Sequence, residues 1–248
     1  MKGREAVPFV ACLLMLAALP WTVRYWPGED DLNHVAIAHI VGHLHDAGST
    51  FSSFFRGDLR PRPYPLHYYL LLGLAQIVPL LVAEKLVVSL VAIGLPLVGL
   101  WTLVRLAPSR WTNIYLLLPL WSYPPLLLRG LTNFVLGTAL AIGTIPLLAV
   151  ETPSRARILL ASALFFLAML AHPFACFVVG VVLVALHGRA LFSLRQRSAL
   201  VAWTRLLVVV APAAALLAVA AVENHLRRAD LPVVGPLVSV HRLATEFG

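Results

Sequence analysis

Charged side chains are scarce in this sequence, and their scarcity decides the class of protein. Asp, Glu, Lys and Arg make up 12% of the 248 residues, whereas 60% of the residues are hydrophobic. A soluble domain of this size needs many more polar side chains to cover its surface, which excludes an ordinary soluble globular protein. We therefore expect an all-α, polytopic membrane helix bundle whose solvent is largely lipid.

Cysteine is almost absent as well. Cys12 and Cys176 both lie inside apolar runs, so nothing suggests a disulfide framework or a zinc site. The formal net charge of +8 would indicate nucleic-acid binding in a soluble chain, but in a membrane protein Arg and Lys collect in cytoplasmic loops. We expect membrane lipids, and no nucleic acid, as partners; the oligomeric state stays open.

The apolar residues form eight runs, several of them shorter than the roughly 20 residues that span hydrocarbon. The first run, 6–22, has the pattern of a cleaved signal peptide or of an uncleaved first helix, and the many apolar runs that follow favour the helix. The pair 158–171 and 174–187 is broken at His172-Pro173 and forms one kinked helix or two short ones. The other runs are 66–83, 86–104, 112–128, 132–150 and 206–222.

Two arrangements of these runs give about seven spans, with an inner N-terminus and an outer C-terminus. In the first, 66–83 is an outer or re-entrant helix and His172-Pro173 is an outer turn; the inner segments then carry a net charge of +8 and the outer ones zero. In the second, 66–83 spans and 158–187 is one helix, which gives +6 inside and +2 outside. The positive-inside rule favours the first.

Both arrangements divide the chain in the same way. Residues 1–222 form the transmembrane module, with a first outer loop at 23–64. Residues 223–248 are polar and look like the start of a further outer loop that has been cut short.

The first outer loop holds the most unusual group of charges. Glu29, Asp30 and Asp31 stand together where the first apolar run meets water, and charges near a bilayer usually mark function or a helix end. Residues 32–47 have the length and polarity of a helix that lies on the membrane surface. The acids therefore either carry chemistry or cap this helix, whose N-terminus favours negative charge.

This layout resembles the GT-C superfamily of integral-membrane glycosyltransferases, whose long first outer loop carries an acidic motif and surface-lying helices. Residues 30–36, Asp-Asp-Leu-Asn-His-Val-Ala, are similar to that motif, with Asp in place of Glu and His in place of Tyr. Residues 63–69, Pro-Tyr-Pro-Leu-His-Tyr-Tyr, are similar to the Pro-Pro-Leu-Tyr-Tyr-like start of the next apolar segment. Residues 124–133 match the second outer turn, but they lack the carboxylate that members often place there.

The resemblance implies transfer of a sugar from a polyprenyl-phosphate carrier to an acceptor on the outer face of a bacterial cytoplasmic membrane, with inversion at the anomeric carbon. It implies Asp30 as the base that accepts the acceptor's proton, with Asp31 as a helper or a metal ligand. The departing phosphate is met by Arg or by a divalent cation. A divalent cation is therefore compatible with the reaction, and no other cofactor is assigned.

Five further residues are candidates for substrate binding. Arg129, an isolated charge between two apolar runs, either meets phosphate or snorkels to lipid headgroups. His172, at a helix break, either lines the substrate cavity or is a satisfied polar residue at a kink. His39 and His43 have a spacing that can hold a metal, but the polar face of a surface helix explains them better, so no metal site is assigned. The remaining candidates are His34, Arg62 and His67.

Two other functions stay open. The early stop and the missing second carboxylate favour a non-catalytic truncated relative or a lipid-handling membrane subunit. A small transporter is the weaker alternative, because inverted repeats and charges within the spans are nearly absent. The sequence identifies neither the sugar nor the acceptor.

Overall fold

The computed structural model describes residues 3–55, 57, 60–107, 121–150, 152–191 and 197–230. These residues form helices joined by turns and contain no β-strand. The expected all-α fold class is therefore confirmed.

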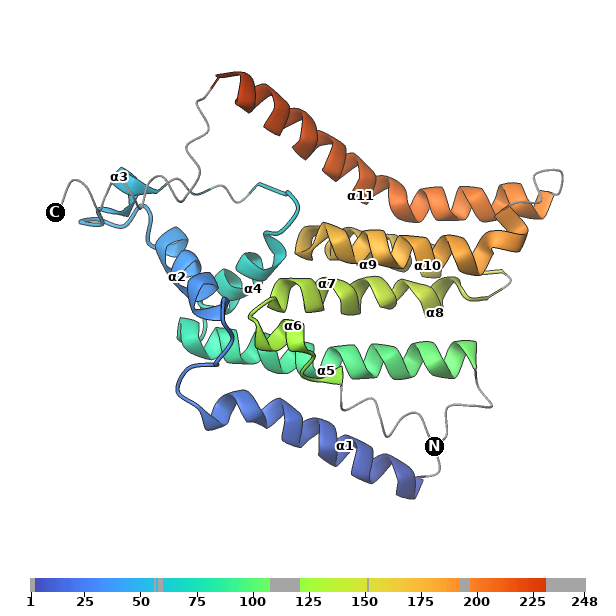
Figure 1. Ribbon diagram of the computed structural model, residues 1–248, viewed down its shortest axis with the longest axis horizontal. Coiled ribbons are helices and arrows are strands. Elements are labelled where there is room, and N and C mark those ends of the chain that lie inside the picture. Colours follow the sequence, from blue (N-terminus) through green and yellow to red (C-terminus); the bar gives the residue numbers. More distant parts are fainter. Residues whose placement is uncertain are drawn as a thin grey trace.

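The longer helices run side by side and form a bundle (Figure 1). They are α1 (Gly3–Ala18), α5 (Leu80–Leu106), α7 (Thr132–Ile142), α8 (Thr144–Leu148), α9 (Arg155–Ala171), α10 (Pro173–Leu191) and α11 (Arg197–Asp230). Helix α8 continues α7 beyond Gly143. Short elements lie between them: η1 (Leu19–Thr22), α2 (Asp31–Gly42), α3 (Phe51–Phe54), α4 (Leu66–Leu74) and α6 (Pro125–Leu128). Helix α11 contains Pro212, which interrupts the backbone hydrogen-bond ladder, and its C-terminal half bends away from the bundle (Figure 1).

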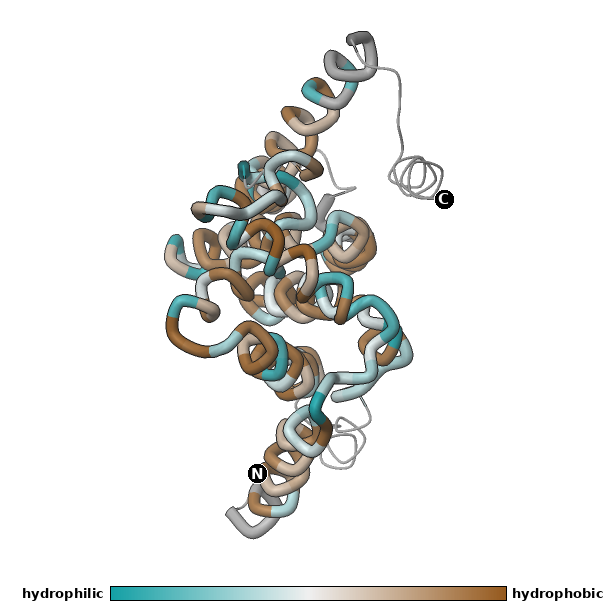
Figure 2. Tube along the Cα trace, turned by 90° about the vertical axis from the view of Figure 1, so that its left-hand side faces the viewer, coloured by the Kyte–Doolittle hydropathy of each residue, from teal (hydrophilic) through white to brown (hydrophobic). Residues whose placement is uncertain are grey.

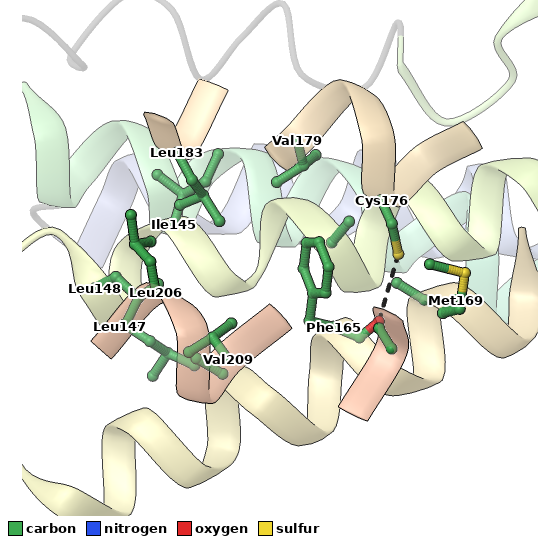
Figure 3. Close-up of a cluster of buried hydrophobic side chains, with 14 residues drawn as sticks. Ile145, Leu147, Leu148, Phe165, Met169, Cys176, Val179, Leu183, Leu206 and Val209 are labelled. Atoms are coloured by element: carbon green, nitrogen blue, oxygen red, sulfur yellow. Dashed lines mark hydrogen bonds between the residues drawn. The ribbon is translucent and has the colours of Figure 1, made fainter. Parts of the chain in front are cut away.

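The bundle is held by apolar clusters between neighbouring helices. Figure 3 shows the largest, in which side chains from α8, α9, α10 and α11 interdigitate and the Cys176 thiol donates to the Phe165 carbonyl oxygen at 3.4 Å. Helix α1 belongs to the same body, because Phe9 and Leu13 are buried against α5 and Ser89 Oγ donates to the Ala17 carbonyl at 2.8 Å.

The break at His172 separates two helices. His172 has an extended backbone after α9, and Pro173 begins α10. Helix α4 has nine residues and is about 14 Å long, too short to cross hydrocarbon. Both features agree with the first of the two chain arrangements. In Figure 1 the N-terminal end of α1 and the ends of α5, α8 and α10 lie at one end of the bundle, and α2, α4 and the α9–α10 turn lie at the other.

The helix predicted over 32–47 is shorter than expected: α2 ends at Gly42, so residues 43–47 form turns. Glycine is a poor helix former, and beyond it the Asp46 amide donates to the His43 carbonyl and the Ser49 amide to the Asp46 carbonyl. Gly48 takes a φ of 84°, which lets the chain reverse without a Cβ clash.

The apolar runs predicted at 66–83 and 86–104 are divided at a different point. The chain turns over residues 75–79, and α5 begins at Leu80, so Glu84 and Lys85 lie inside a helix rather than between two. Both have partners there, because the Glu84 side chain faces His67 and Lys85 Nζ donates to the Val23 carbonyl at 2.5 Å. Most of the run 112–128 lies outside the described residues, as does the tail beyond 230.

Two helices of the described chain, Leu80–Leu106 and Ala199–Glu223, are long and apolar enough to cross a membrane. Shorter apolar helices cover Val7–Thr22, Thr132–Leu148 and Pro173–Gly188. The number of seven spans stays a prediction.

Candidate functional site

The residues predicted to form a site belong to segments that meet at one end of the bundle, where α2, α4, the start of α5, the α6–α7 turn and the α9–α10 turn lie (Figure 1). Figure 2 looks onto this end, where hydrophilic segments lie among hydrophobic helices. The predicted residues are Asp30, Asp31, His34, Arg62, His67, Arg129 and His172.

A buried polar cluster lies at this end, with one side chain from each of four helices. Asp31 of α2, His67 of α4, Glu84 of α5 and Thr132 of α7 are 1%, 1%, 3% and 0% exposed. Thr132 Oγ1 donates to Asp31 Oδ1 at 2.8 Å, and His67 Nε2 lies 3.3 Å from Glu84 Oε2. We call these four residues the acid cluster.

The two carboxyl groups of the acid cluster lie in an interior with few hydrogen-bond donors. Burial, and next the charge of Glu84, raise the pKa of Asp31 to about 7, against smaller opposing effects of Thr132 and His67. Within the described residues, Asp31 Oδ2 and both Glu84 oxygens accept no hydrogen bond. Asp31 therefore retains its proton up to near-neutral pH, and in that state its hydroxyl can donate to Glu84.

Asp30 lies beside the acid cluster but is exposed. Its amide donates to the Arg129 carbonyl at 3.3 Å, and its Oδ1 accepts from Asn33 Nδ2 at 3.3 Å. The exposed Arg129 is thus joined to Asp30 through the backbone, 99 positions along the chain.

Two glycines make the close approach to the acids possible. Gly130 has a φ of 77°, and a Cβ atom there would collide with the backbone of Asp30 and Asp31. At Gly28 a Cβ atom would collide with the Asp31 carboxyl group. The turns at 28–30 and 129–131 therefore close around the start of α2 only because neither glycine has a side chain.

His34 connects α2 to α4. Its Nδ1 and the Tyr68 hydroxyl are hydrogen-bonded at 2.8 Å, and its ring lies 5.2 Å from the His67 ring. Burial, and then the neighbouring His67, lower the pKa of His34, so its imidazole is neutral at pH 7.

His172 lies in an aromatic group next to the acid cluster. The edge of its ring meets Tyr64 at 4.7 Å between centroids and Phe134 at 5.0 Å. Tyr64 has a φ of 88°, which costs a residue other than glycine about 1–3 kcal/mol. Phe134 follows Thr132 by two positions on α7, so the aromatic group and the acid cluster flank the same helix start.

Arg62 contributes to a third group, at the margin of this end. Its Nη2 donates to Glu223 Oε2 of α11 at 2.9 Å, and Arg60 Nη1 lies 3.5 Å from Glu223 Oε1. These ion pairs join the first loop to the part of α11 that bends away from the bundle.

Sequence reasoning missed Glu84, Thr132, Tyr68 and Glu223. Glu84 carried a signal, because it stands between two apolar runs, 66–83 and 86–104, and an ionisable residue within a membrane segment marks a functional site by default. The turn at residues 129–131 has no carboxylate, and Glu84, from a different helix, lines the same small cavity as Asp31. Thr132 carried no signal of its own.

Three further histidines named from the sequence have defined surroundings. His67 was a candidate for substrate contact, and the structure buries it against Glu84. His39 and His43 have ring centroids 4.3 Å apart, and no three or more His, Cys, Asp or Glu side chains within the described segments converge to hold a metal ion.

No family model, curated protein or solved structure matches this chain.

Proposed function

We propose that this protein is a membrane glycosyltransferase of the GT-C type, which transfers a sugar from a polyprenyl-phosphate donor to an acceptor at the outer face of a bacterial cytoplasmic membrane. One observation carries the proposal. Exposed Asp30 is held, beside a buried acid cluster, at the end of a helix bundle and directly after its first apolar helix.

The exterior of the bundle supports a membrane setting. Large apolar side chains such as Leu159, Phe177 and Leu207 are 65%, 67% and 62% exposed. Helix α11 is apolar over Ala199–Glu223 yet largely unburied, which supports lipid around it. We assign about seven spans to the chain, as its apolar runs indicate.

The distribution of charge supports the orientation. Arg105, near the C-terminal end of α5, and Arg155 and Arg157, at the start of α9, belong to the bundle end opposite the acid cluster. By the positive-inside rule that end faces the cytoplasm, so Asp30 faces outward.

The chemistry requires a base and a cation at the same place. An acceptor hydroxyl attacks the anomeric carbon, its proton passes to the Asp30 carboxylate, and the bond from that carbon to the phosphate oxygen breaks. The lipid phosphate leaves with the electron pair and is met by a guanidinium group, for which Arg129 is the residue joined to Asp30.

A cavity of about 510 Å³ between α9, α10 and α11 suits the carrier chain. Its lining is almost entirely apolar and begins at Pro173, next to the aromatic group of His172 and Tyr64. Pro173 follows His172 in the chain, so the aromatic group adjoins this cavity, and we place the sugar phosphate of a lipid-linked donor beside it. The lining includes Phe165, Met169, Cys176, Phe177, Val210 and Leu217.

The test is sugar transfer by the purified protein in vesicles that contain polyprenyl-phosphate carrying a radiolabelled hexose or pentose. Asp30→Asn should abolish transfer while the protein stays folded and abundant, and Asp46→Asn, at another exposed acid of the same loop, should leave it unchanged. Full activity of Asp30→Asn would refute the assignment of the base.

A lipid-handling subunit without transfer activity is the second candidate, favoured by the same apolar cavity. It predicts that the protein binds polyprenyl phosphate in the vesicles and transfers no sugar from any donor supplied.

A further inference from the structure

We propose that Glu84 and His67 are positioning residues for the transfer reaction: they hold Asp31, and through it the first turn of α2, so that Asp30 keeps its place at the surface. The catalytic consequence rests on the proposed function. The positioning itself is a property of the fold and can be measured without a substrate.

Helix α2 needs such support because little else anchors it. It has 12 residues, a length at which an isolated helix is marginal in water, and only Asp31 and Ala38 of it are buried. Its first turn is therefore held by polar contacts, among them those of the Asp31 carboxyl group and of the Asp30 amide with the Arg129 carbonyl. Thr132 holds one oxygen of that group, and the other oxygen lies in the interior.

Glu84, which lines a small cavity together with Asp31, supplies the rigid side of the support. It lies on α5, one turn before Val87 and Val88, which are 1% and 0% exposed in the centre of the bundle. Sites built on packed helices hold their geometry better than sites on loops. Removing the Glu84 side chain would leave His67 Nε2 buried without its acidic neighbour and Asp31 beside an empty space.

His67 connects Glu84 to α2 through the His34 ring. Its ring lies 5.2 Å from His34, and the His34 amide donates to the Asp30 carbonyl at 3.1 Å, which is the first helical hydrogen bond after Asp30. The path from Glu84 through His67 and His34 therefore ends on the same turn that Asp31 holds directly. Displacing that turn by about 1 Å would cost on the order of 100-fold in rate if Asp30 is the base.

Hydrogen exchange of the α2 amides tests the positioning without any substrate. The variants are Glu84→Ala, which removes the carboxyl group, and Glu84→Gln, which keeps its shape and an acceptor oxygen. Thr144→Val is the matched control, because Thr144, at the start of α8, is 0% exposed and its hydroxyl donates to the Ala141 carbonyl of α7. We expect α2 to exchange at least about tenfold faster in Glu84→Ala, as the loss of a buried polar partner implies, and close to the wild-type rate in Glu84→Gln and Thr144→Val.

The inference is overturned if Glu84→Ala folds and leaves α2 exchange unchanged, or if exchange rises equally in α2 and α9. Should Glu84→Ala fail to fold, His67→Gln carries the same test, with faster exchange in α2 and unchanged exchange in α9 as the expected result. Unchanged α2 exchange in that variant would equally refute the support role.

Transfer kinetics then separate positioning from stability alone. With the polyprenyl-phosphate hexose or pentose as donor, Glu84→Ala should lower kcat by about 100-fold with a small change in KM, and Glu84→Gln should restore most of kcat. Equal losses in both variants would refute positioning. If the wild type transfers no sugar, the proposed function is refuted. The hydrogen-exchange experiment still tests whether Glu84 supports α2, because it needs no substrate.

Discussion

Asp30 and Asp31 are neighbours in the chain, yet their surroundings differ in every respect that governs acid–base behaviour. Asp30 is exposed at the end of the bundle, whereas Asp31 is 1% exposed among Thr132, Glu84 and His67. The residue before a helix and the first residue within it point in different directions, which assigns one acid to solvent and the other to the interior. In our proposal this separates the base from the residue that holds it.

The raised pKa of Asp31 predicts a pH dependence of stability. The pKa of Asp31 rises from 3.8 to about 7 on folding, so the folded state binds the proton more tightly than the unfolded state does. The contribution of Asp31 to the stability of the protein is therefore greatest below pH 4 and falls as the pH rises toward 7. The loss has a maximum slope of about 1.4 kcal/mol per pH unit. Melting of the detergent-solubilised protein between pH 5 and 8 should show this decline, and Asp31→Asn should remove it. A decline that persists in Asp31→Asn would assign it to another group.

Gly130 gives a second prediction at the residue scale. Gly130→Ala should destabilise the protein by about 1–3 kcal/mol, because a Cβ atom meets the backbone of Asp30 and because φ is 77°. Gly48→Ala shares the positive φ but has nothing within 4 Å of its Cβ, so it should cost less. Equal denaturation midpoints for the two variants would contradict the close approach of the two turns.

At the scale of elements, α7 and α9 approach each other through a small residue. A Cβ atom at Gly137 would lie 3.2 Å from the His172 amide nitrogen and 3.3 Å from the Ala168 carbonyl oxygen. Small residues allow membrane helices to pack closely, and here the close packing also fixes the α9–α10 turn that carries His172.

Gly137→Leu should therefore force α7 and α9 apart. We expect lower thermal stability and a loss of sugar transfer, since His172 would move from Tyr64 and Phe134. Gly94→Leu is the matched control inside α5, where nothing lies within 4 Å of a Cβ atom. Comparable yields, melting temperatures and activities for both variants would refute the tight α7–α9 contact.

At the scale of the whole molecule, the ends of the helices lie in two groups, at opposite ends of the bundle. In the proposed orientation, the end that carries the acid cluster faces outward. The exposed residues Ser52, in α3, and Thr152, before α9, belong to opposite ends. With Cys12 and Cys176 replaced by alanine, Ser52→Cys should react with a membrane-impermeant maleimide in intact cells. Thr152→Cys should react only after the membrane is opened. The reverse pattern would invert the orientation.

Part of this protein follows from its sequence alone. The excess of apolar residues indicates helices in lipid, because the backbone must satisfy its hydrogen bonds internally there. The grouping of charge indicates an orientation, and Glu29, Asp30 and Asp31 mark the loop after the first helix as the place for chemistry. These inferences depend on composition and on neighbours in the chain.

Only the tertiary structure brings the four residues of the acid cluster together. Asp31, His67, Glu84 and Thr132 are spread over about 100 positions, and nothing local to any of them specifies the others. Glu84 looked like a break between two apolar runs, and it became a buried neighbour of Asp31 because α5 begins at Leu80 and packs beside α2, α4 and α7. Helix ends and long-range contacts depend on which helices pack together, and that choice is made by the shape of the whole bundle.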